Sequence, residues 1–190
     1  MKTIEKKEKN KTKQSTLDHQ WSFDYLMQEF NKESDRASVI LVASLLDDSL
    51  NSLLRTFLVP APSSNDELFE GANAAASNFS SKIDLSYRLE LISSKFCRDL
   101  HLIRKIRNSF AHNIFGCSFE NGSIKSRVDE LRKSAIGTVK LEGPSDDHRG
   151  AFLTVASHML YELNEVREGV QNLTERPLEF FYLENEKEEG

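Results

Sequence analysis

The residues with the clearest chemical potential stand within six positions of one another, in the segment 107–112. Arg107 contributes a guanidinium, Asn108 an amide and His112 an imidazole. An imidazole exchanges protons near neutral pH, so His112 is a candidate general acid or base. A permanently charged guanidinium can stabilise the negative charge that develops on a phosphate in a transition state. Asn108 would hold His112 or a phosphate oxygen, and this chemistry requires neither a metal nor a cofactor.

Helical geometry limits how these side chains can meet. Each residue of an α-helix turns the chain by about 100°, so Arg107 and His112 would stand about 140° apart. Asn108 and His112 are four residues apart and share a face, and Arg104 extends that row. A joint Arg107–His112 site therefore requires the helix to end before His112, or a second subunit related by a twofold axis. We expect the second arrangement, a homodimer whose shared groove carries the positive charges of Arg104 and Lys105.

A helix over residues 93–114 must position these groups. Its apolar residues recur at helical spacing, and Arg107 occupies a position where that spacing predicts an apolar residue. Burying an unpaired guanidinium is costly, so Arg107 either has a partner or borders a cleft. His112 alternatively only caps the end of the helix, where a cation is favoured. The apolar positions are Phe96, Leu100, Ile103, Phe110 and Ile114.

The strongest helix is predicted over residues 34–58, with Ser34 as its N-cap. Because its sequence is apolar on two faces, we expect it to be the central helix of the fold. Asp47 lies on one of those apolar faces with Asp48 beside it, and a buried carboxylate needs a partner. Arg107 is the natural candidate, since arginine–carboxylate pairs can be bidentate. Such a pair either belongs to a functional site or only fixes the fold.

The remaining sequence is also helical in pattern, with no strand-rich region and no repeat. Ser81 and Asp84 fit a capping box for one helix, and Ser145 is the expected cap of the last helix. Residues 59–79 form the main loop, with one helical turn at 66–70. The fold class is therefore all-α, a bundle of about five to seven helices. Further helices are expected over 17–31, 82–91, 123–134 and 145–174, with an irregular link over 137–143 that includes a short extended piece at 138–141.

Charge and length divide the chain into three parts. The first fourteen residues carry six lysines against two glutamates, so we expect a disordered basic tail over 1–16. That tail is either simply solvated or a nucleic-acid-binding arm. Residues 17–176 are long enough for one helical domain, and 177–190 form an acidic tail. The net charge of −5 argues against a broad nucleic-acid surface.

Cysteine and histidine usage indicates no metal site. Cys97 and Cys117 lack any Cys-x-x-Cys spacing, which excludes the usual zinc and redox motifs and favours a reducing cytoplasm. His101 lies near the row of Arg104 and either extends a basic strip or lies on a solvated face, and we expect the solvated face. The sequence has no run of about 18 apolar residues, so no membrane span is predicted, and its charged start is not a secretory signal.

Two resemblances sharpen these expectations. The run RKIRNSFAH over 104–112 resembles the Arg-x4-6-His motif of the HEPN superfamily, which implies a helical bundle, often dimeric. Many members are metal-independent ribonucleases and others are binding modules. Residues 33–133 resemble the mannitol operon repressor (MltR-like) family, over a little more than half the chain. The matching segments are LLDDSLNSLL, FEGANAAASNFSSKIDLSYRL and LHLIRKIRNSFAH.

These resemblances imply three functions from different classes. The first is an MltR-like transcriptional regulator that acts through a protein partner or nucleic acid; no convincing helix-turn-helix supports direct DNA reading. The second is an HEPN-type ribonuclease of a toxin or defence system, in which an RNA 2′-hydroxyl attacks and Arg107, Asn108 and His112 are catalytic. The third is an inactive helical scaffold. In the scaffold Arg107 pairs with an aspartate and nothing is bound. For the first two functions the supporting binding residues are expected to be Arg104, Lys105, Asp47 and Asp48.

Overall fold

A computed structural model describes residues 23–113, 115–137 and 146–176 of the chain. Within these residues the structure contains six α-helices and no strand, which confirms the all-α prediction. The predicted basic and acidic tails, the start of the first predicted helix and the extended piece at 138–141 lie outside the described residues. The helices are α2 (Phe23–Asn31), α3 (Asp35–Phe57), α4 (Phe79–Arg88), α5 (Ser94–His112), α6 (Gly122–Ala135) and α7 (His148–Gly169).

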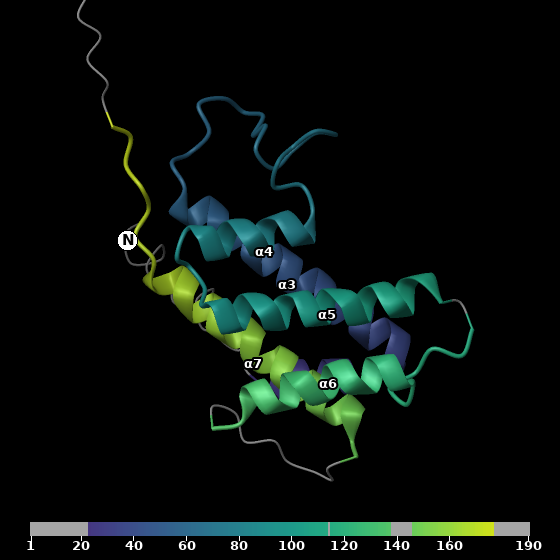
Figure 1. Cartoon of the computed structure of the whole chain (residues 1–190). Coiled ribbons are helices and arrows are strands. Elements are labelled where there is room, and N and C mark those ends of the chain that lie inside the picture. Colours follow the sequence, from purple (N-terminus) through teal and green to yellow (C-terminus); the bar gives the residue numbers. More distant parts are fainter. Residues whose placement is uncertain (1–22, 114, 138–145, 177–190) are drawn as a thin grey trace, which may run out of the picture.

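Helix α3 is the central helix, as its two apolar faces predict. It contacts α2, α4, α5 and α7, and Figure 1 shows it behind α4 and α5. Its start is fixed by Ser34, whose side chain accepts a hydrogen bond from the amide of Ala37. Leu46, Leu50 and Leu53 are fully buried along it. Burial of this apolar surface is the main force that assembles the bundle around α3.

Helix α3 is also long and apolar enough, by length and composition, to cross a membrane. An 18-residue window within it has a mean hydropathy of 1.4. The core helix of a globular bundle acquires the same composition, because it buries side chains on more than one face. The four helices around α3 account for its apolar sequence in this way.

Four of the other helices pack on α3, and α6 joins the bundle through α5 and α7. Helix α5 lies between α4 and α6 (Figure 1). Helix α6 packs on α7, which also contacts α2. The rings of Phe110, Phe119 and Phe152 follow one another at 5.4 Å between centroids, so aromatic packing joins α5, the turn before α6, and α7. As a result α5 is held on three sides, and its side chains have well-defined neighbours.

Two predicted helix starts are wrong. Helix α4 begins at Phe79 because Asn78 is its N-cap, accepting a hydrogen bond from the amide of Ser81 at 3.0 Å. Ser81 therefore lies inside the helix and caps nothing. The earlier start lets Phe79 pack against the core. Helix α7 begins after Asp147, whose carboxylate accepts from the amide of Gly150 at 2.7 Å, and it ends at Gly169, five residues before the predicted end.

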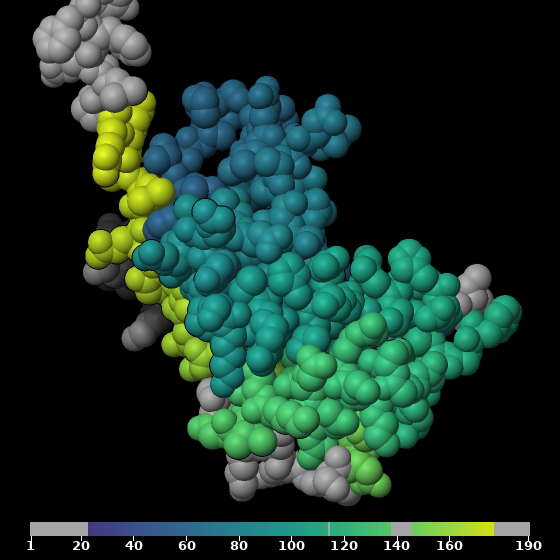
Figure 2. Space-filling view, viewed as in Figure 1, coloured from purple at the N-terminus to yellow at the C-terminus, as the bar shows by residue number. Residues whose placement is uncertain are grey.

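The loop between α3 and α4 is anchored at its middle by the predicted helical turn. The amides of Phe69 and Glu70 both donate to the carbonyl of Asp66. Arg55 of α3 binds the carboxylates of Asp66 at 2.8 Å and Glu70 at 3.0 Å, and its guanidinium lies 4.4 Å from the centroid of the Phe69 ring. Figure 2 shows this loop, coloured blue, projecting from the body of the bundle.

Candidate functional site

Arg107 is exposed and does not occupy a core position. Ile106, one residue earlier, is fully buried and provides the apolar side chain between Ile103 and Phe110. The shift of one residue rotates Arg107 by about 100° towards solvent. Its guanidinium donates to Oδ1 of Asn108 at 3.1 Å.

The predicted pair between Arg107 and Asp47 or Asp48 is not formed. Asp47 instead accepts from Nζ of Lys82, on α4, at 2.8 Å. The Lys82 side chain is only 10% exposed, whereas that of Asp47 is 33% exposed. Asp48 is exposed on the next position of α3. Lys82 can pair with this carboxylate because α4 packs directly on α3. The four-carbon stem of Lys82 is buried between the helices while its ammonium reaches Asp47.

Arg107 borders a cleft, which was the other arrangement predicted for it. The cleft measures about 340 Å³ and lies where α3, α4 and α5 meet. Helix α5 contributes cationic and amide groups, the start of α4 contributes a hydroxyl and an amide, and α3 forms the remaining side. The lining residues are Arg104, Arg107, Asn108, Asn78, Phe79, Ser80, Ala43, Ser44 and Asp47.

The charge of this cleft is positive. Among the described residues no carboxylate forms an ion pair with Arg104 or Arg107, and Nε of Arg104 is buried without a hydrogen-bond partner. The one lining carboxylate, that of Asp47, is neutralised by Lys82. The first-turn amides of Phe79 and Ser80 have no intrahelical acceptor, and the positive end of the α4 dipole lies at the same place. An anion the size of a phosphate or carboxylate therefore fits the chemistry of the cleft.

The structure does not bring His112 to this cleft. Helix α5 continues without interruption to His112, which is its last residue and is exposed. The 140° separation between Arg107 and His112 is therefore preserved within one chain. The end of α5 is also capped by another residue, since Arg36 of α3 donates to the carbonyl oxygens of Phe110 and Asn113. Lys105 is exposed and does not line the cleft.

The cleft residues Asn78, Ser80 and Ser44 were not predicted from the sequence. Asn78 could have been recognised as a strong N-cap ahead of an apolar residue. Nothing in the sequence distinguishes Ser80 and Ser44 from other surface serines, because their role comes only from the packing of α4 against α3 and α5.

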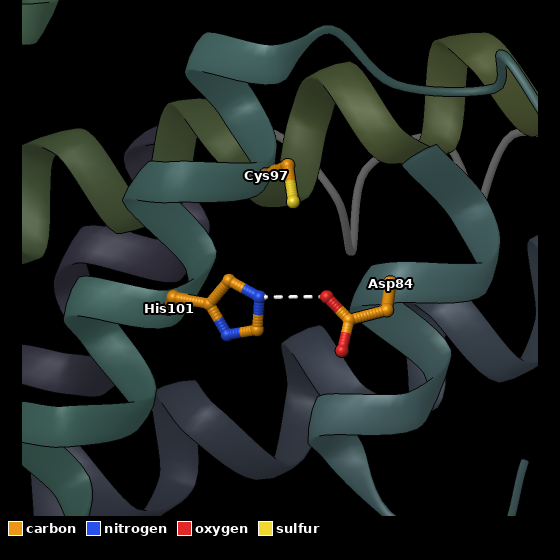
Figure 3. Close-up of side chains that lie close together, drawn as sticks. All are labelled: Asp84, Cys97 and His101. Atoms are coloured by element: carbon orange, nitrogen blue, oxygen red, sulfur yellow. Dashed lines mark hydrogen bonds and ion pairs between the residues drawn. The ribbon is translucent and has the colours of Figure 1, made fainter. Parts of the chain in front are cut away.

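A second cluster was also missed, and it joins α4 to α5 (Figure 3). Nε2 of His101 lies 3.0 Å from a carboxylate oxygen of Asp84, and Sγ of Cys97 lies close to both. The expected solvated role of His101 is therefore wrong, because its side chain is only 24% exposed and is paired with Asp84. The spacing of Cys97 and His101, four residues apart on one helix, was the available signal.

No protein-family model matches the chain, and no curated protein matches it. Among solved structures, the X-ray structure of the MtlR–HPr complex from Escherichia coli matches with a TM-score of 0.49 at 20% sequence identity. The match covers 77% of this chain and 96% of that chain.

Proposed function

We propose that this protein is an MltR-like regulatory protein that acts in the cytoplasm through a protein partner. In this proposal the cleft between α3, α4 and α5 receives an anionic group of that partner, either a carboxylate or a phosphoryl group. The observation that supports it is the pair of arginines, Arg104 and Arg107, which line one cleft without any carboxylate partner among the described residues. Arginine is well suited to this task because its planar fork binds two oxygens of one anion.

A binding role fits this geometry better than ribonuclease activity. Catalysis needs an acid or base within hydrogen-bond reach of the group it protonates. His112 is the candidate for that role, and in one chain it lies outside the cleft that holds Arg107. Among the described residues that line the cleft, Asp47 is the other titratable group that could serve as a base, and it is paired with Lys82. The ribonuclease alternative therefore depends on a homodimer that would supply His112 from a second subunit.

The first test measures anion binding at the cleft. Sulfate and inorganic phosphate should raise the melting temperature of the wild-type chain at constant ionic strength, because an anion bound only to the folded state shifts unfolding by mass action. The double variant R104A/R107A should lose that effect. Lys105→Ala is the control, because it removes one positive charge from an exposed position of the same helix outside the cleft. Equal stabilisation of all three proteins by the anions would overturn the proposed site.

The second test identifies the class of partner. HPr serves as the protein probe, since it is the partner named in the similar MtlR–HPr structure. A single-stranded RNA in the presence of EDTA serves as the nucleic-acid probe. The proposal predicts that HPr binds, that R104A/R107A weakens this binding and that Lys105→Ala does not. RNA cleavage that disappears in the His112→Ala variant would instead establish the ribonuclease and remove the regulatory proposal.

A further inference from the structure

The cluster of Asp84, Cys97 and His101 combines three different donor atoms at one point of the fold (Figure 3). Asp84 comes from α4, and the other two side chains come from successive turns of α5. Their candidate ligand atoms, a carboxylate oxygen, Sγ and Nε2, all lie within 4.8 Å of one another. In Figure 3 the carboxylate and the imidazole point towards each other and the thiol lies above the gap between them.

We propose that Asp84, Cys97 and His101 bind a divalent transition-metal ion, with Zn²⁺ as the best-fitting ion. Zinc accepts thiolate sulfur, imidazole nitrogen and carboxylate oxygen together, in a tetrahedral arrangement. Three protein ligands leave the fourth position for a water molecule. The ion replaces the direct contact between Nε2 and the carboxylate, which now lie 3.0 Å apart, a spacing that small adjustments of the two side chains turn into coordination.

The protons balance in a simple way. The Cys97 thiol loses its proton to solvent when sulfur binds the ion, so metal binding is accompanied by proton release. The Asp84 carboxylate binds as an anion, and neutral His101 gives the lone pair of Nε2. When Nε2 binds the ion, the neutral ring carries its proton on Nδ1. Nδ1 of His101 is buried and has no hydrogen-bond partner among the described residues, so no hydrogen bond at that atom has to break.

The site is reachable from solvent and sits where an ion would add rigidity. The Asp84 side chain is 63% exposed, which gives an entry path, whereas His101 and Cys97 are partly buried and fixed by their helix. An ion bound there would tie α4 to α5 beside their short connection. Both helices also contribute residues to the arginine-lined cleft, so the ion would hold those two parts of its lining at a constant separation.

The test is a titration of the chelator-treated full-length chain with Zn²⁺ and Co²⁺. We expect one tightly bound ion per chain, a rise in melting temperature, and a near-ultraviolet thiolate-to-Co²⁺ charge-transfer band. Cys97→Ser should abolish the band. His101→Gln and Asp84→Asn should each weaken affinity by at least about tenfold, since even the loss of an outer-shell partner costs about 10–100-fold.

Two matched controls separate this site from adventitious binding. Cys117→Ser removes the other cysteine of the chain and should leave the band and the affinity unchanged. Arg107→Ala should also leave them unchanged, because it alters the cleft and not the cluster. Circular dichroism of each variant checks folding, and Asp84→Asn, at an exposed position, keeps the test valid should a buried variant fail to fold. Absence of saturable binding, or a band that follows Cys117 and not Cys97, would overturn the proposal.

Discussion

The pair between Lys82 and Asp47 predicts an unequal response to removal of its two partners. The Lys82 side chain is 10% exposed and that of Asp47 is 33% exposed, at an Nζ to Oδ1 distance of 2.8 Å. Removal of Asp47 leaves a nearly buried ammonium without a counter-charge. Removal of Lys82 leaves a carboxylate that water can still reach from the cleft. Asp47→Ala should therefore destabilise the protein more than Lys82→Met.

The magnitudes follow from burial. Breaking a buried pair by removing one partner costs about 3–5 kcal/mol, and partial exposure of Asp47 places this pair at the low end, about 3 kcal/mol. Alanine regains about 0.5 kcal/mol of helix propensity in the interior of α3, which leaves a net loss of about 2.5 kcal/mol. For a chain of this length that corresponds to a fall in melting temperature of about 5–10 °C. Lys82→Met keeps the apolar stem in place and should cost about 1 kcal/mol or less.

The assay is thermal and urea unfolding of both single variants and of the double variant, which completes a double-mutant cycle. The double variant should be more stable than Asp47→Ala alone, because it no longer contains the stranded ammonium. Arg107→Ala is the control. Since Arg107 is exposed, its loss should change stability by about 0.5 kcal/mol at most. The reasoning is refuted if Asp47→Ala melts within about 1 °C of wild type, or if Lys82→Met is the less stable single variant.

Three further predictions concern other parts of the molecule. Arg36→Ala should lower the free energy of unfolding by about 2 kcal/mol, because it uncovers carbonyl groups at the end of α5, and urea unfolding measures this. His158 packs on the Phe23 ring, and burial lowers the pKa of its imidazole below 6.5. The neutral ring therefore contributes stability above pH 6.5. That stability is lost as the pH falls, because the buried ring must take up a proton. His158→Gln should therefore flatten the fall in melting temperature from pH 7 to pH 5. Sedimentation at micromolar concentration should give about twice the 21.7 kDa chain mass if the predicted homodimer forms, and a monomer would remove the ribonuclease alternative.

Helix existence and order could be predicted from the sequence because the hydrophobic periodicity is strong. Helix α3 begins where Ser34 predicts, since Ser34 is a good cap directly before an apolar-periodic segment. Helix α5 begins at Ser94, within one residue of the predicted start, and Ser93 is its N-cap. The starts of α4 and α7 were less determined, because each lies in a run with several residues able to cap. Asn78 prevails over Ser81 because the helix that starts there buries Phe79 against the core, and local propensity does not contain that information.

The cleft was harder to predict because it depends on the rotation of α5 by a single residue. After Ile103, the next residue on the apolar face of α5 can be Ile106 or residue 107, because residues three and four positions apart both lie on one helix face. A guanidinium buried at the core position would need Asp47 as its counter-charge. In the structure Ile106 occupies the core position, and Asp47 is paired with Lys82. Arg107 and Arg104 are then left without a carboxylate, on the side of α5 that faces the start of α4. The positive charge of the cleft thus follows from the same packing that separates Arg107 from Asp47, which is why the binding proposal rests on these two arginines and not on a buried ion pair.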